Sequence, residues 1–480
     1  MTTKKDLVEA HAFSRRRLVT AFVSGAPGGR EVEPTRPGRT IVGGVAVAVL
    51  LVAGAAVASV LSPRASSDWD QQGLVVTKSG ERFIVTKDKE PLRPIINLTS
   101  AQLILGLGVE PQVVSADTVK GETPGATIGI AGASESLPTQ GDFIESGWTA
   151  CTQAAQVGDT GVAVSVRHDP AVSSGAGSAY VVTTGGDDEW LIAEESGADG
   201  VPQARRYALP HPAGPVLQAL FGQQLSAARV PASWLALFPE GTPIGAAGFP
   251  YEAPDPSAIS RAPGMPDNVK AGDLGAFQGQ SYLILKDGVL PLSPFQAAVY
   301  QNTVNPKTHQ PPGTPVTFGR SPVGSYSRQH LPSADWPTSR PKAGDGAACA
   351  QLVAAPGHDA QVRLAIHPGA SAWPAESAPS PGDVVQSVEP GKGAFVYSGR
   401  GTDTEGLLPW VIDSRGTASQ LGTSRTVSTL GLADYKAPVV PDTWIKLFGQ
   451  GVALSTEQAL CPPAYTTVEK TASCAPAASS

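Results

Sequence analysis

The sequence predicts an α+β protein with a single transmembrane helix. An exported domain follows, with a central mixed or β core and four peripheral strand–strand–helix repeats in a pseudo-twofold arrangement. Three observations support this prediction. Residues 41–61 form an uncharged apolar run, a strand–strand–helix pattern recurs four times after it, and two twelve-residue segments match at an offset of 210. At 480 residues the chain is also too long for one ordinary domain.

The apolar run extends from Ile41 to Leu61 and contains 21 residues. As a helix it spans about 30 Å, which is the thickness of bilayer hydrocarbon. A cleaved secretion signal is the main alternative, because Ala56-Val57-Ala58 resembles a cleavage site. Such signals have a short basic head and an apolar stretch of about 7–15 residues, whereas this run is longer and follows a forty-residue head. A buried core helix would show a polar face. We therefore predict an uncleaved anchor.

Charge is divided unevenly about this run. Residues 1–40 carry a net charge of +4 and the rest of the chain carries −11. Because Lys and Arg are retained on the cytoplasmic side, we expect a single-pass protein of the inner (cell) membrane. Its N-terminus would be cytoplasmic and residues 62–480 extracytoplasmic. The acidic body argues against nucleic acid as a partner, since phosphate binding needs a basic surface.

The head, residues 1–40, contains a stretch without Gly or Pro at residues 4–23, where apolar residues recur at helical spacing. This pattern predicts an amphipathic helix. It carries the basic triplet Arg15, Arg16 and Arg17. Such a helix could lie on the anionic inner leaflet or dock on a cytoplasmic partner, and a plain topology signal is the remaining alternative.

Four cysteines follow the apolar run: Cys151, Cys349, Cys461 and Cys474. An exported location permits disulfides, and four cysteines allow three pairings. Cys461 and Cys474 are 13 residues apart and are expected to pair locally, which leaves Cys151 with Cys349. The sequence has no C-x-x-C, and its histidines lack ligand spacing, so no metal site is predicted.

The clearest repeat is VPASWLALFPEG at 230–241 and VPDTWIKLFGQG at 440–451. Six positions are identical, including the Trp and the Phe, and such a duplication indicates a repeated structural unit. A looser strand–strand–helix unit occurs at 81–108, 189–222, 281–301 and 395–432.

The third copy has the strongest local signals. Asp287-Gly288 predicts a hairpin turn, and Ser293 followed by Pro294 predicts a helix start. A hairpin and a short helix cannot bury their own apolar face, so each unit should pack on a neighbour or on a shared centre.

The cysteines also follow the duplication. WTACTQ at 148–153 and GAACAQ at 346–351 share Cys and Gln at an offset of 198, which predicts two related halves joined by Cys151 and Cys349 at a pseudo-twofold centre. The predicted division is head 1–40, transmembrane helix 41–61, repeat 1 at 62–110, first half of the central domain 111–177, repeat 2 at 178–250, linker 251–271, repeat 3 at 272–301, second half of the central domain 302–392, repeat 4 at 393–462 and tail 463–480.

Catalytic motifs are missing from the sequence. Gly391-Lys392 lacks the remainder of a phosphate-binding loop, and no nucleophile elbow, H-E-x-x-H or dinucleotide fingerprint occurs. His168-Asp169 is best read as a surface loop. Asn97-Leu98-Thr99 fits a glycosylation pattern, but we expect Thr99 or Ser100 to cap a helix there. The sequence thus predicts no catalytic residue and no cofactor.

Together, several segments resemble the EccB family of actinobacterial type VII (ESX) secretion systems. The resemblance covers nearly the whole chain and rests on the head at 7–27, the single anchor, PLRPIINLTSAQLILG at 91–106, GATIGIAGASESLP at 125–138, Trp148 with Cys151, the hairpin with PLSPFQA at 291–297, and Cys349.

The resemblance implies a single-pass membrane protein with a central domain, four repeats and a disulfide that maps onto Cys151 and Cys349. It further implies assembly with a secretion ATPase, a multi-spanning channel-like component and a membrane-anchored protease, and contact between paired exported domains. We therefore expect a structural component that scaffolds the extracytoplasmic side and docks on the cytoplasmic ring. Family members are also described as ATP-hydrolysing.

Two alternatives to the scaffold role are an extracytoplasmic ATPase or other hydrolase, and a cell-wall-binding module. The chain also departs from the family pattern. Cys461 and Cys474 are not associated with it, and longer loops are expected at 194–204 and 399–408.

Overall fold

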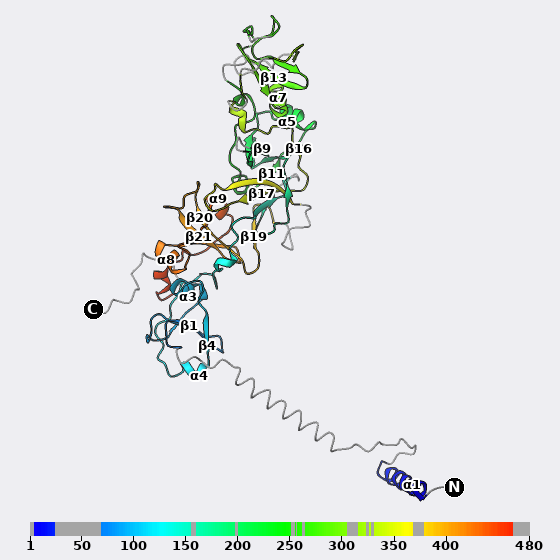
Figure 1. Ribbon diagram of the computed structural model, residues 1–480, viewed down its shortest axis with the longest axis vertical. Coiled ribbons are helices and arrows are strands. Elements are labelled where there is room, and N and C mark those ends of the chain that lie inside the picture. Colours follow the sequence, from blue (N-terminus) through cyan, green and yellow to red (C-terminus); the bar gives the residue numbers. More distant parts are fainter. Residues whose placement is uncertain are drawn as a thin grey trace, which may run out of the picture. The chain divides into compact units, whose positions relative to one another are not determined.

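The computed structural model describes residues 4–24, 69–154, 160–196, 200–250, 255, 257–261, 265–304, 315–322, 326–327, 331–367 and 379–463 (Figure 1). The chain divides into two compact units, Met1–Ser66 and Ser67–Ser480, which are described separately. The predicted anchor at 41–61 lies outside the described residues. Within those residues, no helix is both long enough and apolar enough to cross a bilayer.

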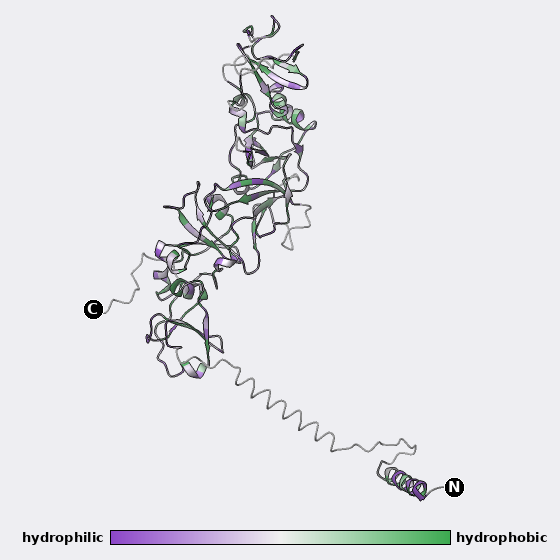
Figure 2. Cartoon of the chain, viewed as in Figure 1, coloured by the Kyte–Doolittle hydropathy of each residue, from purple (hydrophilic) through white to green (hydrophobic). Residues whose placement is uncertain are grey.

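The first unit contains helix α1 (Lys4–Ser24), which covers the segment expected to be helical. Its two faces are only weakly separated. At about 100° per residue, Leu18 and Phe22 share one side, but Phe13 lies on the opposite side and Arg15 interrupts the apolar one. Figure 2 accordingly shows hydrophilic and hydrophobic residues interleaved along α1. The helix is therefore less amphipathic than its sequence spacing predicts.

A six-stranded sheet forms the centre of the second unit, in the order β19-β6-β5-β17-β18-β7. These strands are β5 (Trp148–Thr152), β6 (Val162–Val166), β7 (Ser173–Ser174), β17 (Ala347–Val353), β18 (Gln361–His367) and β19 (Val384–Val388). The hairpins β5–β6 and β17–β18 meet along the antiparallel pair β5–β17. The next strand of each half then crosses over: β7 pairs with β18, and β19 with β6.

The second unit also contains four smaller sheets, and all four have the same topology. Three antiparallel strands are followed by a helix and then by a short strand that returns parallel to the first. Repeat 1 consists of β1 (Gly73–Thr77), β2 (Arg82–Val85), β3 (Arg93–Pro94), α3 (Leu98–Leu105) and β4 (Pro111–Val114). Repeat 2 consists of β8 (Ser178–Thr183), β9 (Glu189–Ser196), β10 (Pro202–Ala208), α5 (Gly214–Phe221) and β11 (Ala228–Arg229).

Repeats 3 and 4 follow the same order. Repeat 3 consists of β12 (Leu274–Phe277), β13 (Gln280–Ile284), β14 (Val289–Leu292), α7 (Pro294–Gln301) and β15 (Val316–Thr317). Repeat 4 consists of β20 (Ala394–Ser398), β21 (Leu408–Ile412), β22 (Thr417–Gln420), α8 (Ser424–Thr429) and β23 (Val439–Val440). Shorter elements are α4 (Ala116–Val119), η1 (Gln140–Asp142), α6 (Ala232–Leu235), η2 (Ala246–Gly248), η4 (Pro332–Asp335), β16 (Lys342–Ala343), α9 (Asp442–Ile445), β24 (Gly449–Gln450) and α10 (Thr456–Ala459).

The strand–strand–helix prediction is therefore incomplete, because each unit also has a third strand and a return strand. The sheet of repeat 1 continues past residue 110 through β4, and that of repeat 3 continues past residue 301 through β15. The strand β16, from the predicted second half of the central domain, pairs with β8 of repeat 2. The return strands β11, β15 and β23, and the strand β16, are only two residues long, so pairing in the folded protein, rather than sequence alternation, defines them.

Each repeat sheet is apolar on both faces. The helix-bearing faces of repeats 2 and 3 share one core that includes Val181 and Phe295. Those of repeats 1 and 4 meet in another core that includes Leu103 and Phe395. The second faces of repeats 2 and 4 pack on the central sheet in the largest core, which includes Trp148. The duplication thus places two repeat pairs around one sheet.

The predicted start of the helix in repeat 3 is confirmed. Ser293 caps α7 and Pro294 occupies the first turn, and Ser293 and Gln296 form a capping box. The preceding turn closes through a hydrogen bond from the Leu285 amide to the Gly288 carbonyl, at 2.8 Å. Asp287-Gly288 lies within it, as its sequence indicates.

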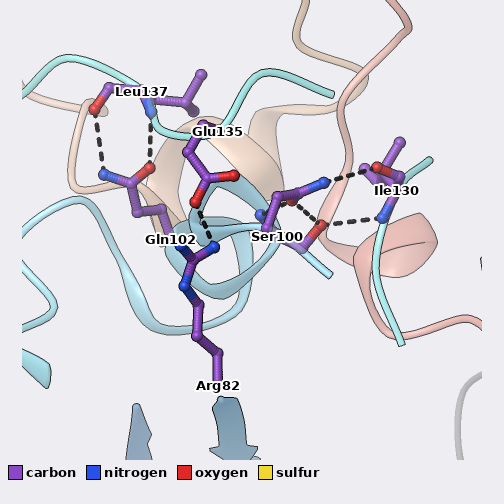
Figure 3. A network of polar contacts seen from close by, with 7 residues as sticks. Arg82, Ser100, Gln102, Ile130, Glu135 and Leu137 are labelled. Carbon is purple, nitrogen blue, oxygen red and sulfur yellow. Dashed lines mark hydrogen bonds and ion pairs between the residues drawn. The ribbon is translucent and has the colours of Figure 1, made fainter. Parts of the chain in front are cut away.

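The expected cap of the helix in repeat 1 is wrong. Asn97 itself caps α3, because its Oδ1 accepts the Ser100 amide at 2.9 Å. The Asn97 side chain is 6 % exposed, and its Nδ2 donates to the Ile130 carbonyl at 2.9 Å. Gln102 then donates to the Leu137 carbonyl and accepts its amide, at 3.1 and 2.8 Å. Figure 3 shows how these side chains hold residues 130–137 against α3.

Candidate functional site

The predicted cysteine pair lies at the centre of the six-stranded sheet. Cys151 on β5 stands directly opposite Cys349 on β17, and the two form a disulfide with a Cα–Cα distance of 4.0 Å. Their side chains are 5 % and 0 % exposed and pack with Ala365 and Val172. The bond joins the two halves of the chain across 198 residues and closes a loop that contains repeats 2 and 3.

The duplicated Trp segments clamp the repeats to this sheet. Pro231 and Pro441 precede the one-turn helices α6 and α9, and Trp234 and Trp444 are fully buried in the same core. Beyond each turn the chain returns to its repeat sheet. The Gly241 amide donates to the Arg206 backbone carbonyl at 2.9 Å, and the Gly451 amide donates to the Ala418 backbone carbonyl at 2.8 Å. The identical residues of the repeat therefore have matching structural roles.

The two tryptophans differ in one respect. Trp234 Nε1 donates to the Ala150 carbonyl at 2.8 Å, next to Cys151. Trp444 Nε1 is buried and has no hydrogen-bond partner among the residues that the structure describes. On the repeat 4 side, Trp148 and Phe448 pack edge to face at 5.4 Å, and Gln386 of β19 donates to the Leu447 carbonyl at 2.9 Å. Only the repeat 2 side is anchored to the central sheet by an indole hydrogen bond.

A partly buried ion pair between repeat 2 and the central sheet was not predicted. Glu194 on β9 is 4 % exposed and accepts Nε and Nη2 of Arg363 on β18, at 3.0 and 3.2 Å. It also accepts the Leu364 amide at 2.9 Å. The sequence reading placed Glu194 at the start of a loop, but it lies inside a strand because β10 pairs with β9 along its length. A polar cavity of about 270 Å³ adjoins the pair and is also lined by Thr338.

Lys392 and His168, the two sequence positions that resemble parts of catalytic motifs, each form an ion pair. Lys392 Nζ lies 2.9 Å from Asp142 Oδ1, so the lysine of the Gly391-Lys392 pair forms an ion pair with a carboxylate. Hydrogen bonds from Thr139 and Lys392 lower the pKa of the Asp142 carboxyl. His168 Nδ1 lies 3.5 Å from Glu389 Oε2 at an exposed position. In the described ranges no three His, Cys, Asp or Glu side chains cluster as a metal site would require.

The remaining predicted residues lie elsewhere. The side chains of Arg15, Arg16 and Arg17 are exposed on α1. Cys461 is disulfide-bonded, and its carbonyl accepts the Gly129 amide of the loop after repeat 1 at 3.0 Å. The other predicted positions lie outside the described residues: Ile41, Leu61 and Cys474.

Comparison with known proteins gives the family. The profile of the type VII secretion system ESX-1 EccB proteins, described as transport TM domain B, matches residues 1–463. The chain belongs to the EccB family. This confirms the resemblance drawn from the sequence.

Individual EccB proteins are similar over much of the chain. The Mycobacterium tuberculosis protein named ESX-3 secretion system ATPase EccB3 is 27 % identical over 479 residues, which cover 89 % of this chain and 84 % of the relative. The protein named ESX-5 secretion system ATPase EccB5, from the same species, is 30 % identical over 308 residues, covering 61 % and 58 %.

Solved structures share the fold. A chain of the EccB3 dimer from the ESX-3 core complex has a TM-score of 0.59 and 21 % identity, covering 81 % of this chain and 99 % of that one. A chain of an intact ESX-5 inner membrane complex has a TM-score of 0.57 and 22 % identity, covering 98 % and 97 %. The mixed α+β architecture is therefore that of solved EccB structures.

We predict that Cys151→Ser destabilises the protein more than Cys461→Ser does. The central bond closes a 198-residue loop, for which chain entropy gives about 4–5 kcal/mol. If Cys461 pairs with Cys474, that bond constrains only a short segment near the end of the chain. Thermal unfolding of both full-length variants in detergent measures the difference, and equal shifts in melting temperature would contradict the central role of Cys151.

The two tryptophans provide a matched pair for a second prediction. Trp234→Phe and Trp444→Phe remove the same atoms from fully buried sites, but only the first breaks a hydrogen bond. We expect Trp234→Phe to cost about 1–2 kcal/mol more in the free energy of unfolding. Urea unfolding of the two variants measures this difference. A larger loss for Trp444→Phe would show that the Ala150 hydrogen bond does not anchor repeat 2.

Proposed function

We propose that this EccB protein is a structural, membrane-anchored component of a type VII secretion translocon. Residues 62–480 would scaffold the extracytoplasmic side, and the head would dock on the cytoplasmic ring. One observation carries the proposal: a disulfide-tied central sheet holds four repeats of the same topology, and the chain has no catalytic motif. Similar solved chains come from complexes described as an ESX-5 inner membrane complex and its periplasmic assembly.

The arrangement of the repeats suits a scaffold. Repeats 2 and 4 pack directly on the central sheet, and each shares a buried core with a second repeat, so one connected body presents several outer surfaces. Rigid presentation of several surfaces favours assembly, because less conformational freedom is lost on binding. The partners that we propose are the membrane, a secretion ATPase, multi-spanning channel components and a second copy of the exported domain.

Membrane topology is part of the same proposal. The anchor at 41–61 would cross the inner membrane once, with the N-terminus in the cytoplasm. The uneven charge about this run and the disulfide beyond it both support the orientation, since disulfides persist outside the cytoplasm.

ATP hydrolysis is the second candidate, because the relatives carry "ATPase" in their names. It lacks support from this chain, whose only Gly-Lys pair, Gly391-Lys392, places its lysine against Asp142. Nucleotide turnover by the purified full-length protein decides between the two functions. Turnover that a point substitution abolishes would establish an enzyme.

The scaffold role is tested by purification of the tagged protein from native membranes in mild detergent, with mass spectrometry of the co-eluting proteins. Recovery of a secretion ATPase and a multi-spanning component is expected. If the protein elutes alone from the same membranes, the scaffold proposal fails.

We further predict that Arg15→Ala, Arg16→Ala and Arg17→Ala combined reduce recovery of the complex at least about fivefold while the second unit stays folded. The three cations are exposed on α1, so their removal weakens binding to an acidic partner without disturbing a core. Replacement of the three by Lys keeps the charge and is the control. Normal recovery with the Ala variant would reduce the triplet to a topology signal.

A further inference from the structure

The segment at residues 449–461, which includes α10, joins repeat 1 to repeat 4. Thr456 Oγ1 donates to the Leu103 carbonyl in the last turn of α3, at 2.8 Å. Carbonyls at a helix end lack partners within the helix, so this bond satisfies a group that would otherwise be buried and unpaired. The amide of Thr456 donates to Thr426 Oγ1 on α8 at 3.3 Å. One residue, 8 % exposed, therefore bonds the helices of both repeats.

The same segment makes a second connection to repeat 1. The Gly129 amide donates to the Cys461 carbonyl at 3.0 Å. Leu454 and Ala459 of the same segment are buried in the core that the repeats share. The contacts of residues 449–461 with repeat 1 thus consist of two polar bonds and one apolar patch.

Repeat 1 also has cores of its own. Ile84 and Ala101 belong to a cluster on the helix face, and Val75 and Val85 belong to one on the opposite face. Neither includes a residue of repeat 4. The side chains in Figure 3 hold residues 130–137 to α3 within the same repeat. Repeat 1 therefore keeps most of its packing if its contact with repeat 4 is broken.

Repeats 2 and 3 are joined differently. One continuous core runs through both sheets and helices, from Leu191 in repeat 2 to Leu283 in repeat 3. Local opening follows the boundaries between cooperative units. Repeats 1 and 4 also share a core, but only α3 and the segment after it enter that core from repeat 1. The sheet residues under α3, such as Leu74 and Ile84, lie in a separate core, whereas the corresponding residues of repeat 3 lie in the core shared with repeat 2. The boundary between repeats 1 and 4 is therefore the weaker of the two.

We propose that residues 449–461 are a conformational lock that holds repeat 1 against repeat 4, and that repeat 1 opens as an intact unit when the lock is released. Thr456 is the central residue of the lock. Repeat 1 directly follows the predicted anchor in the sequence, so it is the first part of the exported body along the chain. The proposal does not depend on the secretion role.

Two neighbouring amides test it. The Gly129 amide is bonded to Cys461 across the repeats, whereas the Ile130 amide is bonded to Ser100 Oγ inside repeat 1, at 2.9 Å. Opening of an intact repeat 1 exposes the first amide and leaves the second protected. We expect Thr456→Val, in the full-length protein in detergent, to speed hydrogen exchange of Gly129 about tenfold and to leave Ile130 unchanged.

Thr456→Ser is the matched control, because it keeps the hydroxyl that donates to Leu103. Its exchange should equal that of the unaltered protein. The proposal is overturned if Thr456→Val changes neither amide, if it speeds both equally, or if Thr456→Ser has the same effect as Thr456→Val. Equal acceleration would mean that repeat 1 unfolds rather than opens.

Discussion

The pairing of β5 with β17 is the constraint on which the second unit depends. Cys151 and Cys349 face each other in this pair, and the disulfide fixes the register between the two halves. A slip by one residue would turn every side chain of a strand to the other face of the sheet. The buried Trp148 and the Ala150 carbonyl that receives Trp234 lie on the same strand, so both repeat contacts depend on that register.

The two halves pack a repeat on the central sheet in the same way, but different interactions hold each repeat there. Each half places a one-turn helix with a buried Trp on the central sheet. The repeat 2 side adds an indole hydrogen bond and the ion pair of Glu194 with Arg363, in which the carboxylate is buried and the guanidinium is 32 % exposed. The two parallel hydrogen bonds of this pair have a defined geometry, so they fix the orientation of repeat 2 on the central sheet. On the repeat 4 side, Trp148 packs against Phe448, and Gln386 of β19 donates to the Leu447 carbonyl at 2.9 Å.

Sequence reasoning identified the features that short patterns encode. The Trp segments, the cysteine offset and the Ser293 cap each depend on a few adjacent residues, and each matches the structure. The family also follows from such motifs. The basic triplet lies on a helix as predicted, and its docking role stays a prediction. The anchor lies outside the described residues and stays a prediction.

The features that sequence reasoning missed depend on distant contacts. The return strands β11 and β15 are two residues long and are strands only because they pair with β8 and β12. Asn97 caps α3 in part because Ile130, thirty-three residues away, accepts its amide. From the sequence, Glu194 was expected at the start of a loop. In the structure it lies in a strand and pairs with Arg363 from the other half of the chain. None of these partners is visible in a local window.

We infer that the disulfide-tied sheet makes the two halves one cooperative unit. Native-state hydrogen exchange across a urea series tests this through the opening free energies of amides in β6 and β18. Both strands are expected to open with the same free energy and the same urea dependence in the oxidised protein. Two separate opening free energies, one for each half, would contradict it.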